Sequence, residues 1–393
     1  MNFTWEVPTR IHFGTGICAE AMEKEKDTLH DRNALLVYTG HTLKKNGSLD
    51  KVKSLLEQNG CARVLTYCGH GANPDVSEAE EAGKLIRENG IDLIVGFGGG
   101  SAIDLGKGAA VAAVSQTRLS DYLVNGLPAP DKVLPIIAIP TTAGTGSELS
   151  KGAILSDKKL KIKGGIRGRS LTPKVAIVDA FFTHSMPKKL TMETGFDALA
   201  HAMESYLSKK ANLHSENLSL QAIRLIGENL PKLHENLDDH EAREKMSYAS
   251  MLMGMNLYNV GNCLPHRMQY PIGAATSTSH AAGVAALYPS WIKEEYKVAK
   301  DKVTDILKML VGRIPCNSLD AEELMSNFLA EQEMYISLKE LGIREEQIPT
   351  LAKEICGNII TDPIGEAIGI CEKLYRNSIH RKVSCCSDVW EKV

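Results

Sequence analysis

GFDALAHAME, residues 195–204, is the stretch around which the rest of the sequence is organised. It is dense in Ala and Leu, and it has no Pro and no Gly after Gly195, which predicts a helix. Asp197 and His201 are four residues apart, so their side chains project from one face of that helix. A carboxylate and an imidazole on one face make half of a divalent-metal site. The same pair also occurs as an ordinary contact on a helix surface, so both interpretations stand at this point.

Two histidines further along the chain are candidates for the missing ligands. His266 and His280 would lie about 21 Å apart on one straight helix, at 1.5 Å per residue. Pro271 and Gly273 lie between them and interrupt a helix, so the chain can turn and bring both rings to one ion. A single histidine is more often a surface or core residue than a ligand, and the sequence alone leaves that alternative open.

The first 180 residues alternate short apolar segments with helical ones. Strands are expected at residues 34–38, 63–67, 92–97, 133–139 and 175–179. Helices are expected at residues 50–59 and 77–89, the second with Ser77 as N-cap and Glu80 completing a capping box. This alternation predicts an α/β domain, a parallel sheet with helices on both faces, which binds ligands at the carboxyl ends of its strands.

Two glycine-rich turns follow neighbouring strands. GGGSAID, residues 98–104, opens a helix, and its glycines let the backbone approach a phosphate that the free N–H groups hold. Ser101 adds a hydroxyl, and Asp104 is placed to hold a cofactor hydroxyl or amide. PTTAGTGSE, residues 140–148, offers hydroxyls to phosphate, ribose or a nicotinamide amide. The first turn lacks the GxGxxG fingerprint and each turn alone could be an ordinary loop, but together they favour a nucleotide-binding cradle.

From Pro187 onward the pattern is helical, and β-branched runs are scarce. Helices are expected at residues 190–207, 217–233, 241–257, 294–310, 321–341 and 365–376. We therefore expect two domains. Residues 1–183 form an α/β nucleotide-binding domain, and residues 184–393 form an all-helical, metal-binding domain.

Composition narrows the class of protein. The net charge of −3 provides no basic field for nucleic acid or an anionic membrane, and no apolar run is long enough to span a bilayer. The N-terminus lacks the pattern of a signal peptide. The nine cysteines include no CxxC pair, which indicates reduced thiols rather than a disulfide framework. A cytoplasmic enzyme with a small-molecule substrate is the expectation.

Four features in order resemble the iron-containing (group III) alcohol dehydrogenase family: residues 98–110, 140–148 and 195–206, and the two later histidines. The resemblance covers nearly the whole chain. It implies an NAD(P)H-linked alcohol dehydrogenase or aldehyde reductase, with a dehydroquinate synthase-like two-domain layout, an active site in the cleft and a homodimeric assembly. The metal, Fe²⁺ or Zn²⁺, polarises a carbonyl while nicotinamide C4 passes or receives the hydride.

The resemblance also implies which residues bind the metal and the cofactor. The metal ligands it implies are Asp197, His201, His266 and His280. The cofactor-binding residues are expected in the two turns, at the end of the second strand and just beyond the second turn: Thr39, Gly40, Gly99, Gly100, Ser101, Asp104, Thr141, Thr142, Thr145, Ser150 and Lys161.

Three positions depart from the family pattern. Tyr270 stands where many members have a further histidine, and a phenol is a poor base at neutral pH although it hydrogen-bonds or relays a proton. Arg267 stands where the family usually has a small residue; it is either solvated or, facing the cleft, suited to an acidic substrate. Tyr270 and Arg267 are therefore the candidate catalytic residues. Thr39-Gly40 stands where NAD-preferring members have an Asp, so NADP(H) is favoured over NAD(H).

Two other functions remain as alternatives. The first is a lyase that uses bound NAD internally, like dehydroquinate synthase, which would need several basic residues for a substrate phosphate. The second is a non-catalytic nucleotide-binding homologue, because Tyr270 replaces a family histidine. The sequence shows only a sparse basic cluster, which argues against the lyase. The complete ligand set and both glycine-rich turns argue against a non-catalytic protein.

Overall fold

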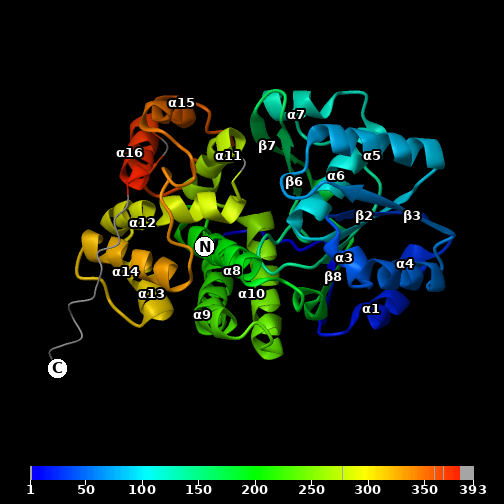
Figure 1. Ribbon diagram of the computed structural model, residues 1–393, viewed down its shortest axis with the longest axis horizontal. Helices are drawn as coiled ribbons and strands as arrows, with labels where there is room; N and C mark the ends of the chain where they lie inside the picture. The colour runs from blue at the N-terminus through cyan, green and yellow to red at the C-terminus, as the bar shows by residue number, and fades with distance from the viewer. Residues whose placement is uncertain (1, 277, 358, 366, 381–393) are drawn as a thin grey trace.

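The structure is a computed structural model that describes residues 2–276, 278–357, 359–365 and 367–380. Its first half is built on a six-stranded parallel sheet with strand order β1-β8-β5-β4-β2-β3 (Figure 1). The strands are β1 (Arg10–Gly14), β2 (Asn33–Thr39), β3 (Arg63–Gly69), β4 (Leu93–Gly98), β5 (Ile136–Pro140) and β8 (Val175–Asp179). The parallel sheet is confirmed, and β1 is a strand that the sequence did not predict.

Helices cover both faces of the sheet because its strands are apolar on both sides. In β2, Leu36 belongs to one buried cluster and its neighbours Leu35 and Val37 to the other, as the two-residue period of a strand requires. The helices of this half are α1 (Cys18–Lys24), α2 (Lys26–Leu29), α3 (Thr42–Lys45), α4 (Ser48–Gln58), α5 (Val76–Asn89), α6 (Gly100–Val114) and α7 (Leu119–Asn125). Residues of α1 and α4 pack on one face, and residues of α5, α6 and α7 on the other.

The start of α5 differs from the prediction. Its N-cap is Asp75, whose carboxylate accepts the Ser77 N–H at 3.0 Å, and Glu78 completes the capping box by accepting the Asp75 N–H at 3.1 Å. Ser77 therefore lies inside the helix, and Glu80 accepts the Leu119 N–H instead. The predicted capping box was wrong because an aspartate two residues earlier offered a better acceptor.

An antiparallel hairpin follows the second glycine-rich turn, and the sequence did not predict it. Its strands are β6 (Gly152–Asp157) and β7 (Ile162–Arg167), and they form a separate two-stranded sheet. β6 packs against α6, and β7 packs against α11 (Leu264–Thr276) of the second half. The hairpin thus connects the nucleotide-binding half to the helical half, as Figure 1 shows.

The second half is helical among the residues that the structure describes, as predicted. Its remaining helices are α8 (Lys188–Leu207), α9 (Leu213–Glu235), α10 (His240–Asn259), α12 (His280–Val298), α13 (Lys300–Val311), α14 (Ser318–Glu331), α15 (Ile348–Lys353) and α16 (Ile368–Ile379). Short 3₁₀ helices span Arg169–Leu171, Ala180–Thr183 and Glu345–Gln347. Two of the expected helices were wrong in extent. The expected 294–310 helix is divided between α12, which already begins at His280, and α13. The expected 321–341 helix is α14, which ends ten residues early, at Glu331.

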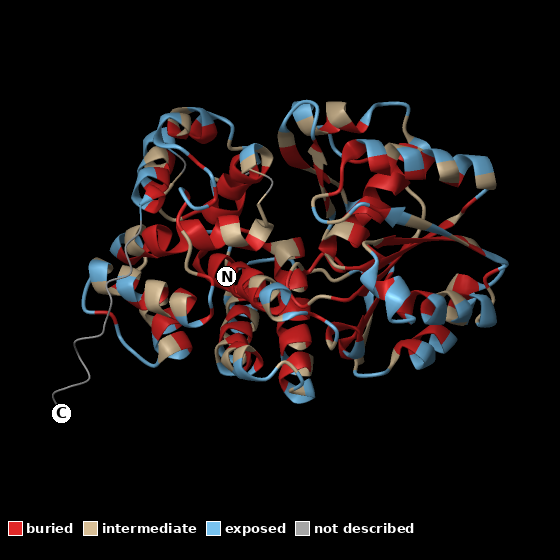
Figure 2. Ribbon diagram, viewed as in Figure 1, coloured by how far each residue is buried: buried red, intermediate tan, exposed pale blue. Residues whose placement is uncertain are grey.

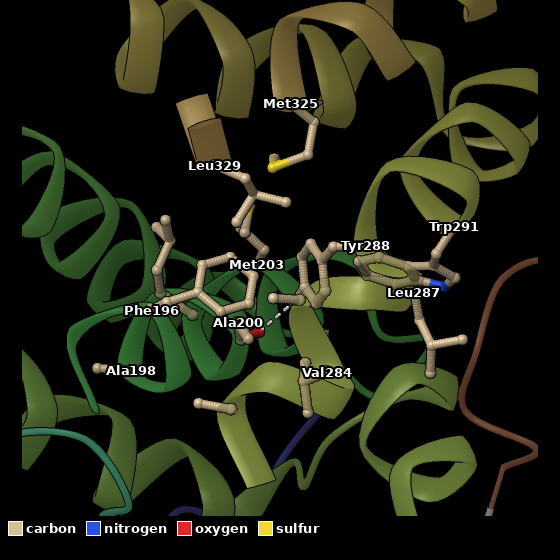
Figure 3. Close-up of a cluster of buried hydrophobic side chains, with 14 of the residues drawn as sticks. Phe196, Ala198, Ala200, Met203, Val284, Leu287, Tyr288, Trp291, Met325 and Leu329 are labelled. Atoms are coloured by element: carbon tan, nitrogen blue, oxygen red, sulfur yellow. Dashed lines mark hydrogen bonds between the residues drawn. The ribbon is translucent and has the colours of Figure 1, made fainter. Parts of the chain in front are cut away.

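α8 is the central helix of this half and is buried from Gly195 to Leu207 (Figure 2). Phe196 and Met203 lie in an apolar cluster with Tyr288 and Trp291 of α12, shown in Figure 3. The Tyr288 hydroxyl also donates to the Ala200 carbonyl at 2.9 Å. Because this apolar packing holds one side of α8, the polar side that carries Asp197 and His201 has a fixed orientation.

Two further features of the structure concern membrane-spanning helices and cysteines. No helix in the described part of the chain is long and apolar enough to cross a membrane. The seven cysteines within the described residues are free thiols. Cys385 and Cys386 lie outside the described residues.

Candidate active site

A cavity of about 380 Å³ lies where the carboxyl ends of the sheet strands meet the helical half. The turn that opens α6 and the Thr/Gly loop after β5 line it on the sheet side. The β6–β7 hairpin, α8, α11 and the segment after α10 line it on the other sides. Its size falls within the usual range for a small-molecule site.

Four predicted metal ligands meet at this cavity. Ligand atoms of Asp197, His201 and His266 all lie within 4.8 Å of one another, and all three side chains are buried. Asp197 Oδ1 is 3.3 Å from His266 Nε2 and 3.7 Å from His280 Nε2. His280 is half-buried and lies at the edge of this cluster rather than within it. The carboxylate of Asp197 is therefore the point on which the imidazoles converge.

The turn between the two later histidines lies beyond the predicted position. Pro271 lies inside α11, which continues to Thr276, whose hydroxyl donates to the Ile272 carbonyl at 2.8 Å. The chain reverses after Thr276, and Ser279 caps α12 by accepting the Ala282 N–H. Pro271 was expected to end the helix, but a proline removes only one donor, and the neighbouring packing tolerates it.

Each histidine makes a hydrogen bond with its other ring nitrogen. His266 Nδ1 is 2.6 Å from Glu204 Oε1, and His280 Nδ1 is 2.5 Å from Gln269 Oε1. His201 Nδ1 is 3.3 Å from the Gly144 carbonyl. These partners leave the three Nε2 atoms for a common ligand, the arrangement that orients metal-binding histidines. Glu204 was missed, yet its spacing of three from His201 and seven from Asp197 places it on the same face of α8.

The electrostatics of the cluster favour a bound cation. Burial raises the pKa of Asp197, but His201, His266 and His280 together hold it well below its ordinary value. Burial lowers the pKa of His201 to about 4, which keeps that ring neutral. Burial also disfavours a charge on His266, yet Glu204 and Asp197 raise its pKa to about 10. A positive charge is thus stabilised between these two carboxylates.

The donor set fits Fe²⁺ or Zn²⁺. One carboxylate oxygen and three imidazole nitrogens are ligands that both ions accept. The hydrogen bonds that the ring Nδ1–H groups donate to Glu204, Gln269 and the Gly144 carbonyl fix the rings as such sites require. The convergence of these side chains, rather than the sequence motif alone, supports a metal centre.

The two glycine-rich turns form the other side of the cavity. No side chain caps the start of α6, so its first N–H groups remain available to an anion. A Cβ atom on Gly100 would lie 2.7 Å from the Thr145 side chain, so only glycine fits there. Gly100, Ser101, Asp104, Thr145 and Ser150 all line the cavity.

Asp104 has an additional role that was not predicted. It is buried, and its two oxygens accept from the Ser147 hydroxyl at 2.5 Å and from the Ile154 N–H at 3.1 Å. One turn later, the fully buried Lys107 donates to the carbonyls of Ser147, Ser150 and Gly152 at 2.7–3.0 Å. α6 therefore fixes the shape of the Thr/Gly loop and of the start of the hairpin.

Six predicted cofactor residues do not line this cavity: Thr39, Gly40, Gly99, Thr141, Thr142 and Lys161. The first five lie at the carboxyl ends of β2, β4 and β5 or directly after them. Lys161 differs, because it is exposed in the turn between β6 and β7. Two residues on, Lys163 lines the cavity and donates to Asn73 Oδ1 at 2.8 Å. The strand period of β7 would have indicated Lys163 had the hairpin been predicted.

Two of the three departures from the family pattern, Arg267 and Tyr270, face the cavity. Arg267 is 9% exposed, and its Nη1 donates to the Tyr270 hydroxyl at 2.9 Å. The ring centroid of Tyr270 is 6.4 Å from that of His280. The prediction for Arg267 had left a solvated side chain as an alternative, and its burial contradicts that alternative. Sequence reasoning missed Asn73, Lys151, Lys163, Arg167 and Lys210, which also line the cavity.

Comparison with known proteins gives matches across both halves of the chain. Residues 8–180 match the family model for iron-containing alcohol dehydrogenase, and residues 191–363 match the C-terminal model of the Fe-containing alcohol dehydrogenase family. The chain is 36% identical over 355 residues to long-chain-alcohol dehydrogenase 1 of Geobacillus thermodenitrificans, covering 88% of each protein. It is 33% identical over 374 residues to 1,3-propanediol dehydrogenase of Citrobacter freundii, covering 92% of this chain and 95% of that protein. A solved 1,3-propanediol oxidoreductase shares 30% identity at a TM-score of 0.88, with 96% of this chain and all of that chain covered.

Proposed function

The chain belongs to the iron-containing alcohol dehydrogenase family, and on that premise we propose a metal-dependent, NAD(P)H-linked alcohol dehydrogenase or aldehyde reductase in which Asp197, His201, His266 and His280 bind the metal. The observation that carries the proposal is the convergence of three histidines on the Asp197 carboxylate beside the glycine-rich turns. Fe²⁺ and Zn²⁺ both suit this donor set.

A bound metal of this kind polarises a carbonyl, and a nicotinamide donates or accepts hydride at C4. The chain positions the two reactants on opposite sides of one cavity. The Thr/Gly loop and the start of α6 hold the cofactor, while α8, α11 and α12 hold the metal. In reduction, a hydride adds to the carbonyl carbon and a proton to its oxygen. Tyr270 Oη already accepts from Arg267 Nη1, so its own proton is free to hydrogen-bond that oxygen.

For the cofactor we propose NADP(H) in preference to NAD(H). The residues that follow β2, from Thr39 to Gly47, include no carboxylate that would repel a 2′-phosphate. The same segment carries His41, Lys44 and Lys45, whose side chains are exposed. The lysine side chains are cationic and His41 carries no negative charge, so this segment supports binding of the 2′-phosphate of NADP(H).

Thr39→Asp tests this preference. We expect the KM for NADPH to rise by roughly tenfold or more, because an introduced carboxylate repels a 2′-phosphate, while the KM for NADH changes little. Thr39→Asn is the matched control, since it has similar size and no charge. Equal effects of the aspartate on both cofactors would contradict the preference.

The two alternatives predict other outcomes in one assay. Metal-loaded protein is mixed with NADPH or NADH and a panel of aldehydes, and cofactor absorbance and product are followed together. The dehydrogenase predicts one cofactor oxidised for each alcohol formed. Product without net change in the cofactor would favour the lyase. No reduction of any aldehyde with either cofactor would favour a non-catalytic protein.

The domain division and the assembly are also proposals. We assign cofactor binding to residues 1–183 and metal binding to residues 184–393, because β8 ends at Asp179 and α8 begins at Lys188. The chain is proposed to act as a homodimer in the cytoplasm. Light scattering of the purified protein tests the dimer directly.

A further inference from the structure

The cavity is rich in basic side chains, which come from the β6–β7 hairpin, from the residue before it and from the helical half. Five cationic residues line it: Lys151, Lys163, Arg167, Lys210 and Arg267. Only Asp104 and Asp197 are acidic among its lining residues, and Asp197 already faces three histidines. Within the described ranges, no carboxylate oxygen lies within 4 Å of any of these five cations. Lys151 and Lys210 are exposed, whereas Lys163 and Arg267 are buried and Arg167 is half-buried. A buried cation without a carboxylate partner destabilises the fold, and an anion bound from outside the chain would compensate its charge.

Arg167 and Arg267 are the two guanidinium groups among these cations, and both line the cavity. Arg267 is only 9% exposed, and its Nε is buried without a hydrogen-bond partner. The backbone of Gly357 packs against its side chain: a Cβ at that position would lie 3.3 Å from Arg267 Cδ. Burial lowers the pKa of Arg167, and the nearby charge of Arg267 lowers it further. The two guanidinium groups therefore line the same cavity, one from the end of β7 and the other from α11.

The two arginines are also close to the metal cluster. Arg267 follows the ligand His266 directly in sequence, and Arg267 Nη1 contacts Tyr270, whose ring is 6.4 Å from that of His280. A small molecule with one oxygen at the histidine cluster can therefore reach Arg267 with its far end. Two guanidinium groups present several N–H donors to one oxyanion, and they favour carboxylate, sulfonate or phosphonate over a neutral group.

We propose that the substrate is a short aldehyde, or the corresponding alcohol, that ends in an oxyanion, and that Arg267 and Arg167 bind this anionic end. This inference rests on the proposed dehydrogenase function and specifies its substrate class. The reaction leaves the anion unchanged: a hydride passes from NAD(P)H to the carbonyl carbon, a proton passes to the oxygen, and NAD(P)⁺ and the hydroxy anion are formed.

A phosphate of the cofactor is the other anion that could occupy this basic region. The cofactor phosphates are expected at the uncapped start of α6 and after β2, both on the sheet side of the cavity. Arg267 lies on α11 in the helical half, next to a metal ligand. The substrate end of the cavity therefore explains the position of Arg267 better than the cofactor does.

Steady-state kinetics with matched aldehydes test the proposal. Aldehydes ending in carboxylate, sulfonate or phosphonate are each compared with the neutral aldehyde of equal chain length, using metal-loaded protein. We expect kcat/KM to favour at least one anionic aldehyde by roughly tenfold or more. In Arg267→Gln and Arg167→Gln, this anionic-to-neutral ratio should fall by roughly 10- to 100-fold, mainly through KM. Arg224→Gln, at an exposed position of α9, is the matched control and should keep the ratio.

The outcomes separate this proposal from the function on which it rests. If neutral aldehydes are reduced as well as anionic ones, or if the ratio survives both arginine substitutions, the anion site is refuted while the dehydrogenase stands. If no aldehyde is reduced, the proposed function fails. If Arg267→Gln instead raises the KM for the cofactor without changing the ratio, the arginine serves the cofactor phosphate and the proposal is wrong.

Binding to the protein without turnover gives a second readout. Ethanesulfonate cannot be reduced by hydride, so it reports the anion site alone. We expect it to raise the melting temperature of the wild-type protein in a concentration-dependent way, and to do so much less in Arg267→Gln. The neutral alcohol 1-propanol serves as the control ligand. An equal shift in both proteins, or none in either, would overturn the assignment of the anion to Arg267.

Discussion

Glu204 holds His266, one of the proposed metal ligands, in its orientation. Its Oε1 lies 2.6 Å from His266 Nδ1, and its Oε2 accepts the Cys263 N–H at 2.7 Å, just before α11 begins. The Tyr288 hydroxyl is a further contact, at 3.3 Å. One carboxylate therefore joins α8, α11 and α12 behind the proposed metal ligands.

Substitution of Glu204 should weaken metal binding without removing a ligand. In Glu204→Gln the amide retains one acceptor but loses the charge that supports His266, and we expect metal affinity to fall by roughly 10- to 100-fold. Competition with a chromophoric chelator measures this affinity. Glu228→Gln, at an exposed position of α9, is the control. Unchanged affinity in Glu204→Gln would show that the contact does not orient His266 for a metal.

The sequence indicated which residues come together in the cavity where those residues lie in a recognisable motif. Asp197, His201, His266 and His280 converge as expected, although no motif indicates how tightly. Arg167 and Lys163 were missed because they belong to the unpredicted hairpin, and nothing in their local sequence distinguishes a buried cation from a solvated one. Burial is a property of the assembled fold, so it could not be derived from residue type alone.

At the scale of elements, close backbone contacts join the Thr/Gly loop to the helices. A Cβ on Gly144 would lie 2.5 Å from the Thr194 carbonyl oxygen of α8, and one on Gly146 would lie 2.7 Å from Gly254 Cα of α10. The Gly144 carbonyl is also the partner of His201 Nδ1. These glycines therefore set the distance between the cofactor turn and the metal-binding helix.

Gly144→Ala should lower the free energy of unfolding by roughly 1–3 kcal/mol, because the new methyl group meets backbone that cannot yield without moving α8. Urea unfolding measures the change. Gly369→Ala is the matched control, since a Cβ there meets nothing within 4 Å and lies in a helix. It should be neutral or stabilising by up to about 1 kcal/mol. Equal stability of the two variants would refute the close contact.

A buried acidic pair anchors the start of α11. Asp362 Oδ2 accepts the Leu264 N–H at 2.8 Å and the Trp291 indole N–H at 3.1 Å. Burial, and then the neighbouring Asp362, raise the pKa of Glu295 well above its ordinary range. Glu295 is therefore protonated in the folded protein at pH values where the unfolded chain ionises it. Because the folded pKa is the higher one, the stability that Glu295 contributes is complete below about pH 4 and falls as the pH rises.

Glu295→Gln should remove this dependence on pH. The variant mimics the protonated side chain and cannot ionise, so we expect it to gain stability relative to the wild type between pH 5 and 9, by about 1 kcal/mol or more at the upper end. Urea unfolding at the two pH values measures the difference. The exposed Glu323→Gln should show none. A constant offset between Glu295→Gln and the wild type at both pH values would contradict a raised pKa.

The sequence predicted strands correctly where the apolar runs are continuous, and it missed strands that polar residues and glycines interrupt. The strands β2, β4 and β8 are continuous apolar runs, and they were placed within one residue at each end. β6 and β7 are interrupted by polar residues and glycines, so their pairing depends on packing against α6 and α11 rather than on their own sequence. α12 and α13 meet without a proline or glycine between them, so nothing in the sequence marked that turn.

At the scale of the whole molecule, both halves of the chain line the candidate active site. The sheet half contributes Gly100, Thr145 and Lys163 to the cavity, and the helical half contributes Asp197 and Arg267. Neither half carries both the proposed cofactor cradle and the proposed metal ligands. The division into an α/β half and a helical half was predictable from the pattern of elements, but the basic lining of the cavity became visible only in the assembled fold.

Metal titration of chelator-stripped protein, followed by aldehyde-dependent NADPH oxidation, tests the central claim most directly. We predict that the stripped protein is inactive and that one equivalent of Fe²⁺ or Zn²⁺ per chain binds and restores activity. His280→Ala should bind metal weakly and remain inactive, while its circular dichroism shows that the fold is retained. Full activity in the stripped protein, or in His280→Ala without bound metal, would contradict the claim that Asp197 and the three histidines form the catalytic metal site.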